Sequence, residues 1–181
     1  MSEVYKMTIS GCERELPLCR VDDTLDIAAF NMFGDVELTE KVAKDLLAKC
    51  PEHDVLITAE AKGIPLCYEM ARLGVRKYVV ARKGIKLYMK NPIHVNVKSI
   101  TTERLQNLYL SEDDYKFLKG KRVLIVDDVI STGESLTAIE MLVEKAGGII
   151  AGKACVLAEG DAAKRNDIIF LEPLPLFNKK A

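Results

Sequence analysis

The sequence lacks the features of several large classes of protein. Its 181 residues contain no apolar run near the roughly 18 residues that a membrane-spanning helix requires. The first ten residues lack the charged-then-apolar order of a secretory signal. Lys plus Arg (26) nearly balance Asp plus Glu (27), so the composition indicates no basic surface for nucleic acid. We therefore expect a cytoplasmic protein that binds neither a membrane nor nucleic acid.

The cysteines and histidines indicate neither disulfide bonds nor a metal site. The five cysteines are scattered without a C-x-x-C spacing, and His53 and His94 lie far apart. We expect reduced thiols and no zinc site. The apolar fraction (49%) and the charged fraction (29%) are ordinary for a globular chain, and the length suits a single domain over residues 1–181.

Alternating strand and helix patterns predict an α/β fold. Residues 54–58 (DVLIT) and 77–82 (KYVVAR) have the apolar runs of buried strands, and residues 65–73 between them have a helical pattern with proline in the first turn. A second helix is predicted over 134–146, and the segments GKACVLAE and DIIFLEPLPLF predict the last strands. This βαβ order favours an open parallel sheet with helices on both faces.

Other segments have patterns of their own. Residues 4–21 alternate around a turn at Gly11, which predicts a β-hairpin that we expect to be an appendage to the core. Thr39 is expected to cap a helix in which Val42, Leu46 and Cys50 recur at helical spacing.

The middle of the chain interrupts the strand and helix alternation. Residues 84–110 are rich in lysine and alternating β-type residues, which indicates a mobile loop or a long hairpin. Ser111, followed by three acidic residues, is expected to cap a short helix that ends at Gly120.

The most informative stretch is VLIVDDVISTGES, residues 123–135. Asp127 and Asp128 follow a buried strand, and ligands of open parallel sheets bind beyond the carboxyl ends of the strands. The next loop leads into a helix whose free N–H groups and positive dipole suit a phosphate. Carboxylates can accept hydrogen bonds from a sugar diol or lie near a divalent cation. Together these features predict a site for a ribose 5-phosphate. The expected phosphate contacts are Ser131, Thr132, Gly133, Glu134 and Ser135.

Three other interpretations of this stretch are weaker. The aspartates could simply end a strand, although so ordered a combination with the loop argues against it. A receiver domain has its paired acids near its start, whereas only 53 residues follow Asp128. A nucleotide hydrolase would need G-x-x-x-x-G-K-[ST], and the chain has none.

The stretch resembles the 5-phosphoribosyl 1-pyrophosphate (PRPP) motif of the type I phosphoribosyltransferases. The resemblance implies that Asp127 and Asp128 hold the ribose hydroxyls and that the following loop binds the 5′-phosphate. Glu134 stands where the family often has a second glycine. Residues 58–66 (TAEAKGIPL) resemble the family's pyrophosphate loop, in both its adenine and its orotate forms. This implies pyrophosphate contacts at Glu60, Ala61, Lys62 and Gly63, with a cis peptide expected at Ala61-Lys62.

Residues 79–92 (VVARKGIKLYMKNP) resemble the strand and basic turn that begin the family's flexible catalytic loop, which would cover about residues 84–110. Arg82, Lys83 and Lys86 would meet the departing pyrophosphate. Glu103 falls near the place where adenine enzymes have a general base, although the surrounding pattern differs.

The resemblance implies displacement of pyrophosphate from PRPP by a nitrogen of a nucleobase. Mg²⁺ is the expected cofactor, bound through PRPP near the two aspartates with no direct protein ligand, and a homodimer is expected. A hood built from about residues 1–37 and 168–181 would select the base, and Phe30, Phe33 or Phe177 could stack on it.

The turn RKGIKL favours adenine, with xanthine or hypoxanthine/guanine as alternatives. A PRPP-sensing regulator without catalytic activity is a further alternative, but the first forty residues contain no helix-turn-helix pattern and no basic stripe. The difference at Glu134 and the unusual hood also allow a weakly active relative with another substrate.

Overall fold

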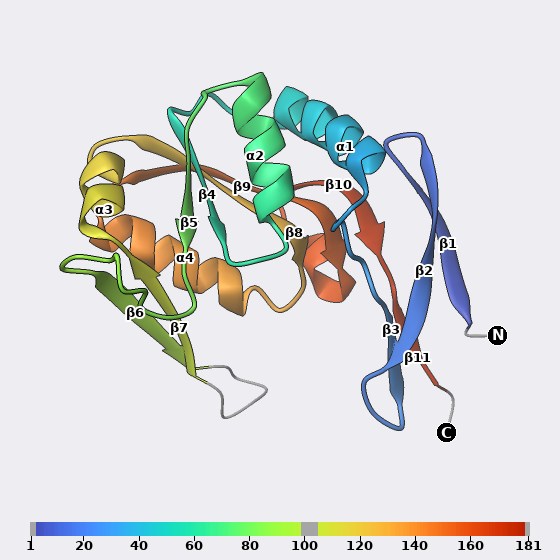
Figure 1. Cartoon of the computed structure of the whole chain (residues 1–181). Helices are drawn as coiled ribbons and strands as arrows, with labels where there is room; N and C mark the ends of the chain where they lie inside the picture. Colours follow the sequence, from blue (N-terminus) through green and yellow to red (C-terminus); the bar gives the residue numbers. More distant parts are fainter. Residues whose placement is uncertain (1–2, 99–104, 180–181) are drawn as a thin grey trace.

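The computed structural model describes residues 3–98 and 105–179. Its centre is a five-stranded, entirely parallel sheet in the order β10-β9-β8-β4-β5 (Figure 1). The five strands are β4 (Val55–Ala59), β5 (Tyr78–Ala81), β8 (Arg122–Ile130), β9 (Ile149–Glu159) and β10 (Ile169–Leu174). The predicted parallel α/β sheet is confirmed.

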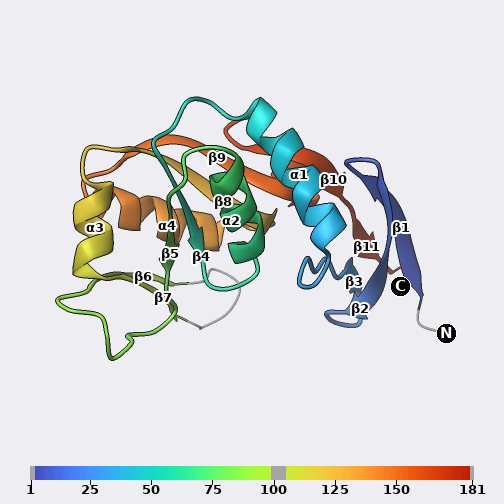
Figure 2. The same ribbon diagram turned by 45° about the horizontal axis from the view of Figure 1, so that its top comes forward.

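Helices cover both faces of this sheet, as expected. Helices α1 (Val36–Lys49) and α2 (Ile64–Leu73) lie on one face and α4 (Glu134–Lys145) on the other (Figures 1 and 2). An apolar core lies on each face of the sheet, because successive side chains of β8 point to opposite faces. Leu124 belongs to the cluster with α1 and α2, whereas Val123 and Ile125 belong to the cluster with α4. Among the described residues, no helix is long and apolar enough to cross a membrane.

The terminal segments form a second, antiparallel sheet in the order β1-β2-β3-β11. Its strands are β1 (Val4–Ile9), β2 (Cys12–Arg20), β3 (Leu25–Ala28) and β11 (Leu176–Asn178). The predicted hairpin is confirmed, but its description as an appendage is wrong. Ile9, Cys12 and Leu16 are buried in the same apolar cluster as α1, because the hairpin packs its inner face against that layer.

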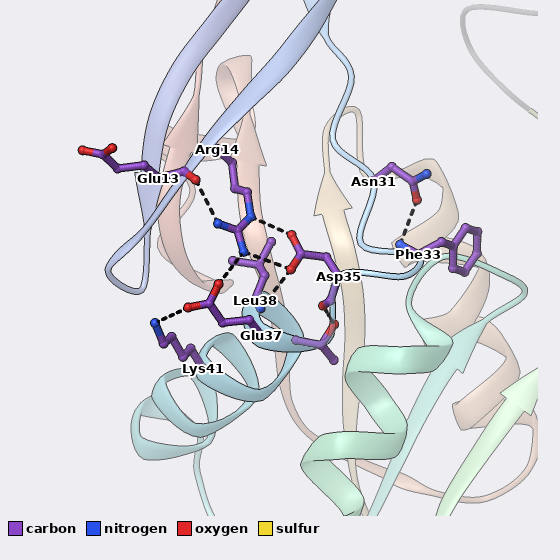
Figure 3. Close-up of polar contacts among 9 residues, drawn as sticks. Glu13, Arg14, Asn31, Phe33, Asp35, Glu37, Leu38 and Lys41 are labelled. Carbon is purple, nitrogen blue, oxygen red and sulfur yellow. Dashed lines mark hydrogen bonds and ion pairs between the residues drawn. The ribbon is translucent and has the colours of Figure 1, made fainter.

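An ion-pair cluster joins this terminal sheet to the start of α1 (Figure 3). The guanidinium of Arg14 donates to both carboxylate oxygens of Asp35, at 2.6 and 2.9 Å. Asp35 also accepts a hydrogen bond from the backbone N–H of Leu38 and is the N-cap of the helix. The prediction of Thr39 as the cap is therefore wrong. Thr39 lies in the first turn, where its hydroxyl donates to the carbonyl of Asp35.

The middle of the chain forms an antiparallel hairpin of β6 (Ile93–Lys98) and β7 (Leu105–Leu110). Val95, Leu108 and Leu110 pack into the core on the side of α4. The hairpin alternative is thus confirmed over residues 93–98 and 105–110, and Glu103 lies outside the described residues. The short helix α3 (Glu112–Leu118) is capped by Ser111 as predicted, and a 3-10 helix (Gly160–Lys164) follows β9.

Candidate active site

The two aspartates lie near the carboxyl end of β8, which continues to Ile130 rather than ending before them. Asp128 is only 6% exposed, and its Oδ2 has no hydrogen-bond partner among the described residues. Oδ1 of Asp127 accepts a hydrogen bond from the backbone N–H of Asp128 at 2.9 Å. Burial raises the pKa of Asp127, and the neighbouring charge of Asp128 raises it further. The pair therefore places two carboxyl groups in a buried position, where Asp127 holds its proton more tightly than an exposed aspartate does.

The loop after β8 forms a small hollow at the start of α4. The hollow is about 150 Å³ and is bounded by residues 129–136 with Asp127. Gly133 has a φ of +83°, which only glycine adopts readily, and it is the N-cap of α4. The backbone N–H groups at the start of this helix favour an anion. The structure thus brings together the five residues predicted to contact a phosphate.

Arg165, which the sequence analysis missed, lies against this loop. Its Nη1 is 2.7 Å from the position that a Cβ on Gly133 would occupy. The other side of its guanidinium donates to both carboxylate oxygens of Asp167, at 2.9 and 2.8 Å. The arginine is 32 residues from Gly133 in the sequence, and no local pattern connects the two.

The turn after β4 approaches the aspartates closely. The cis peptide is Glu60-Ala61, one residue before the predicted Ala61-Lys62. The difference follows from the sheet: β4 pairs with β5 up to Ala59, and the N–H of Glu60 still donates to the carbonyl of Ala81, so the chain turns directly after Glu60. A Cβ on Gly63 would lie 2.3 Å from Oγ1 of Thr58 and 3.2 Å from Oδ1 of Asp127, so the backbone of the turn lies close to both side chains.

Glu60 fixes this turn to the end of β5. Its carboxylate accepts a hydrogen bond from the backbone N–H of Lys83 at 3.1 Å and pairs with the guanidinium of Arg82 at 3.1 Å. The Lys83 N–H lowers the pKa of Glu60, and the charges of Arg82 and Lys86 lower it further. Glu60 and Arg82 therefore neutralise each other's charge. Lys83 also lines the cavity of about 350 Å³ described below, whereas Lys86 is not among its described lining residues.

That cavity, of about 350 Å³, connects the aspartates, the turn after β4 and the terminal sheet. The ammonium of Lys62 reaches across it, 4.0 Å from Oδ2 of Asp128 and 3.4 Å from the carbonyl oxygen of Phe30. Apolar residues of the terminal sheet and of β10 also line the cavity. The described lining residues are Ile27, Ala28, Ala29, Phe30, Ala59, Glu60, Ala61, Lys62, Lys83, Asp127, Asp128, Val129, Ser131, Ser135, Glu159 and Leu174.

Of the three phenylalanines considered for stacking, Phe30 alone lines the cavity. Phe33 is 51% exposed elsewhere, and Phe177 packs edge-on against Tyr5 at 5.1 Å between ring centroids. Glu159, the last residue of β9, also borders the cavity and was missed by the sequence analysis. Its position depends on strand pairing rather than on a local motif.

Comparison with known proteins is consistent with this geometry. The sequence profile of the phosphoribosyl transferase domain matches residues 31–174. A hypoxanthine/guanine phosphoribosyltransferase of Methanotorris igneus is 40% identical over 61% of the chain, and a xanthine phosphoribosyltransferase of Bacillus thuringiensis is 32% identical over 75% of the chain. The matches cover 57% and 70% of these relatives. The chain thus spans less than two thirds of the length of the hypoxanthine/guanine relative.

Solved structures have the same fold. The crystal structure of an adenine phosphoribosyltransferase from Thermoanaerobacter pseudethanolicus superposes with a TM-score of 0.64 at 27% identity, over 78% of this chain and 84% of that one. An adenine phosphoribosyltransferase from Rhodothermus marinus covers 94% of both chains with a TM-score of 0.67, and its 20% identity supports the fold alone.

Proposed function

The chain belongs to the phosphoribosyl transferase domain family, and on that basis we propose that it transfers the 5-phosphoribosyl group of PRPP to a purine base. The observation that carries the proposal is the single cavity bordered by the aspartate pair, the serine-rich loop and two lysines. These groups match the diol, the phosphate and the pyrophosphate of one substrate.

Each end of PRPP has a suitable partner. The 5′-phosphate would lie against residues 131–135 at the start of α4, where N–H groups and hydroxyls donate to it. Asp127 and Asp128 would accept hydrogen bonds from the ribose hydroxyls. The turn at residues 60–63 and the ammonium groups of Lys62 and Lys83 would hold the pyrophosphate.

The reaction breaks the bond between the anomeric carbon and a pyrophosphate oxygen, and a nitrogen of the base forms the new bond at that carbon. Negative charge develops on the leaving pyrophosphate, where Lys62 and Lys83 stabilise it. Arg82 and Lys86 add positive charge beside the turn, and Glu60 keeps it in position. Glu103 is proposed as the general base that takes the proton from the purine nitrogen.

Mg²⁺ is proposed to bind together with PRPP. No three His, Cys, Asp or Glu side chains gather into a metal site in residues 3–98 and 105–179. The buried, unpartnered Oδ2 of Asp128 fits a cation held chiefly by substrate oxygens near Asp127 and Asp128. When bound, the ion supplies charge neutralisation on the pyrophosphate.

Adenine is the first candidate base, supported by the turn RKGIKL and by the adenine enzymes among the structural neighbours. The hypoxanthine/guanine and xanthine relatives support the oxopurines as the second candidates. A cytoplasmic homodimer acting in purine salvage completes the proposal.

The test is pyrophosphate release from PRPP and Mg²⁺ with adenine, hypoxanthine, guanine, xanthine, orotate and uracil. Turnover of a purine well above the pyrimidines is the expected result. PRPP binding without turnover of any base would favour a regulator instead, and the absence of PRPP binding would contradict the proposal.

A further inference from the structure

Among the described residues, four acidic residues line the cavity, and three of them already have partners or proposed roles. Glu60 is engaged by Arg82 and by the N–H of Lys83. Asp127 and Asp128 form the pair at the ribose end of the proposed site. Glu159 is the fourth, and its side-chain carboxylate makes no hydrogen bond or ion pair among the described residues.

Strand pairing determines where Glu159 lies. Ile130 of β8 is paired with Ala158 of β9, so Glu159 stands beside the start of the phosphate loop. On its other side Glu159 pairs with Leu174 of β10, which is buried and lines the apolar end of the cavity. Phe30, two residues after the end of β3, lines the same cavity. Glu159 therefore borders the cavity from the end of a paired strand, together with the apolar residues Leu174 and Phe30.

The chain directly after Glu159 is also constrained. Gly160 has a φ of +59°, and a Cβ there would lie 2.8 Å from Cδ1 of Leu176 in β11. The terminal sheet thus packs onto the turn that follows Glu159. A side chain on such a supported element can determine specificity, because its position changes little when a ligand binds.

The chemistry of Glu159 defines what it can recognise. Burial raises the pKa of Glu159, and the positive charge of Lys62 lowers it. A half-buried carboxylate without a donor is costly, and a ligand N–H removes that cost. Ionised carboxylates only accept hydrogen bonds, and they pair with the exocyclic amino groups of bases. A carbonyl at the same place would face the carboxylate without a hydrogen bond.

We propose that Glu159 reads the base and favours purines that carry an exocyclic amino group, adenine or guanine, over xanthine. This inference rests on the proposed transferase function and adds a specificity-determining residue to it. Adenine carries its amino group at C6 and guanine carries it at C2, whereas xanthine has carbonyls at both positions. The better of the two amino-bearing purines therefore identifies which position of the ring Glu159 contacts.

The test compares Glu159→Gln with wild type. We measure kcat/KM for adenine, guanine and xanthine, and PRPP binding by calorimetry without a base. Glutamine keeps the shape of the side chain and adds a donor for the carbonyls of xanthine. The preference for the better amino-bearing purine over xanthine should be at least about tenfold in wild type and should fall by about tenfold or more in the variant, since a site built around a hydrogen bond discriminates strongly. PRPP binding should not change.

Glu172→Gln is the matched control, because Glu172 lies on β10 and does not line the cavity. It should keep the wild-type preference. If wild type binds PRPP and turns over purines but Glu159→Gln leaves their ratio unchanged, the inference is wrong and the proposed function stands. If wild type fails to bind PRPP, both are overturned.

Discussion

The ammonium of Lys62 lies 4.0 Å from Oδ2 of Asp128, an oxygen that is buried and accepts no hydrogen bond among the described residues. The lysine side chain is 56% exposed, so its compensation of the buried charge is weakened by solvent. In the proposed function, the ammonium of Lys62 pairs with the pyrophosphate of PRPP, and the ribose hydroxyls donate hydrogen bonds to Asp127 and Asp128. On this proposal, the substrate supplies the hydrogen-bond donor that the buried carboxylate of Asp128 lacks in the free protein.

The raised pKa of Asp127 gives stability a defined pH dependence. Burial and the charge of Asp128 raise this pKa above the ordinary 3.8, so the native state holds the proton more tightly than the unfolded chain does. The stability from this group is complete below pH 3.8 and is lost as the pH rises through the raised pKa. Asp127→Asn should lack this decline. The free energy of unfolding of the variant, measured in urea, should therefore increase relative to that of wild type as the pH rises. An advantage that stays constant with pH would contradict the assignment.

Gly63 is needed for the close approach of the turn to β4 and β8. In Gly63→Ala the new Cβ would lie 2.3 Å from Oγ1 of Thr58 and 3.2 Å from Oδ1 of Asp127. Overpacking of this kind costs about 1–3 kcal/mol of unfolding free energy. Adding Thr58→Ala should recover part of that loss. Gly84→Ala, with no atom within 4 Å of its Cβ, is the stability control. Equal losses for the two glycines would show that the packing is not tight.

Alanine at Gly133, compared with alanine at Gly11, separates the effect of backbone strain on stability from an effect on PRPP binding. Gly133 and Gly11 both have positive φ values, +83° and +75°, and Gly11 lies in the β1–β2 turn with open space around it. Alanine at either position costs about 1–2 kcal/mol from the left-handed conformation. Only Gly133→Ala should also weaken PRPP binding, because it displaces the phosphate loop and meets Arg165. Equal PRPP affinity in the two variants would argue against a phosphate site at this loop.

Arg14 tests whether the terminal sheet contributes to base binding. Arg14→Gln removes the ion pair that joins this sheet to α1, so Tm should fall and KM for the base should rise while PRPP affinity stays unchanged. Lys6→Gln removes an exposed pair with Glu15 on the same hairpin and is the control. A base KM that does not change in Arg14→Gln would exclude the hood role of this sheet.

The contribution of the Arg14–Asp35 ion pair to stability depends on pH. The hydrogen bonds from Arg14 lower the pKa of Asp35 below 3.8. The stability that Asp35 contributes is therefore present above pH 3.8 and is lost as the pH falls through its native pKa. The Tm difference between wild type and Arg14→Gln should shrink upon acidification below pH 3.8.

The sequence predicted the features that depend on neighbouring residues. The strands around residues 54–58 and 77–82, the helix after Gly133 and the cap at Ser111 follow from local periodicity and capping chemistry, and the structure contains them. The aspartate pair and the loop proposed to bind phosphate were identified from the sequence for the same reason, since one short stretch contains both.

The errors and omissions involve contacts between distant segments. Asp35 is the cap of α1 in place of Thr39 because Arg14, 21 residues earlier, holds its carboxylate. Arg165 meets Gly133, and Glu159 reaches the cavity, only after β8, β9 and β10 have paired. The register of a sheet is a tertiary property, so these residues could not be identified from local patterns.

The most direct test is calorimetric titration of PRPP with Mg²⁺ into wild type and into Asp127→Asn/Asp128→Asn. Asp45→Asn, on the exposed side of α1, is the control. The double variant should stay folded and bind PRPP about 100-fold more weakly, as expected when two hydrogen bonds to charged groups of about 1.5 kcal/mol each are lost. Wild-type affinity in the double variant would contradict the assignment of these aspartates to the ribose of PRPP.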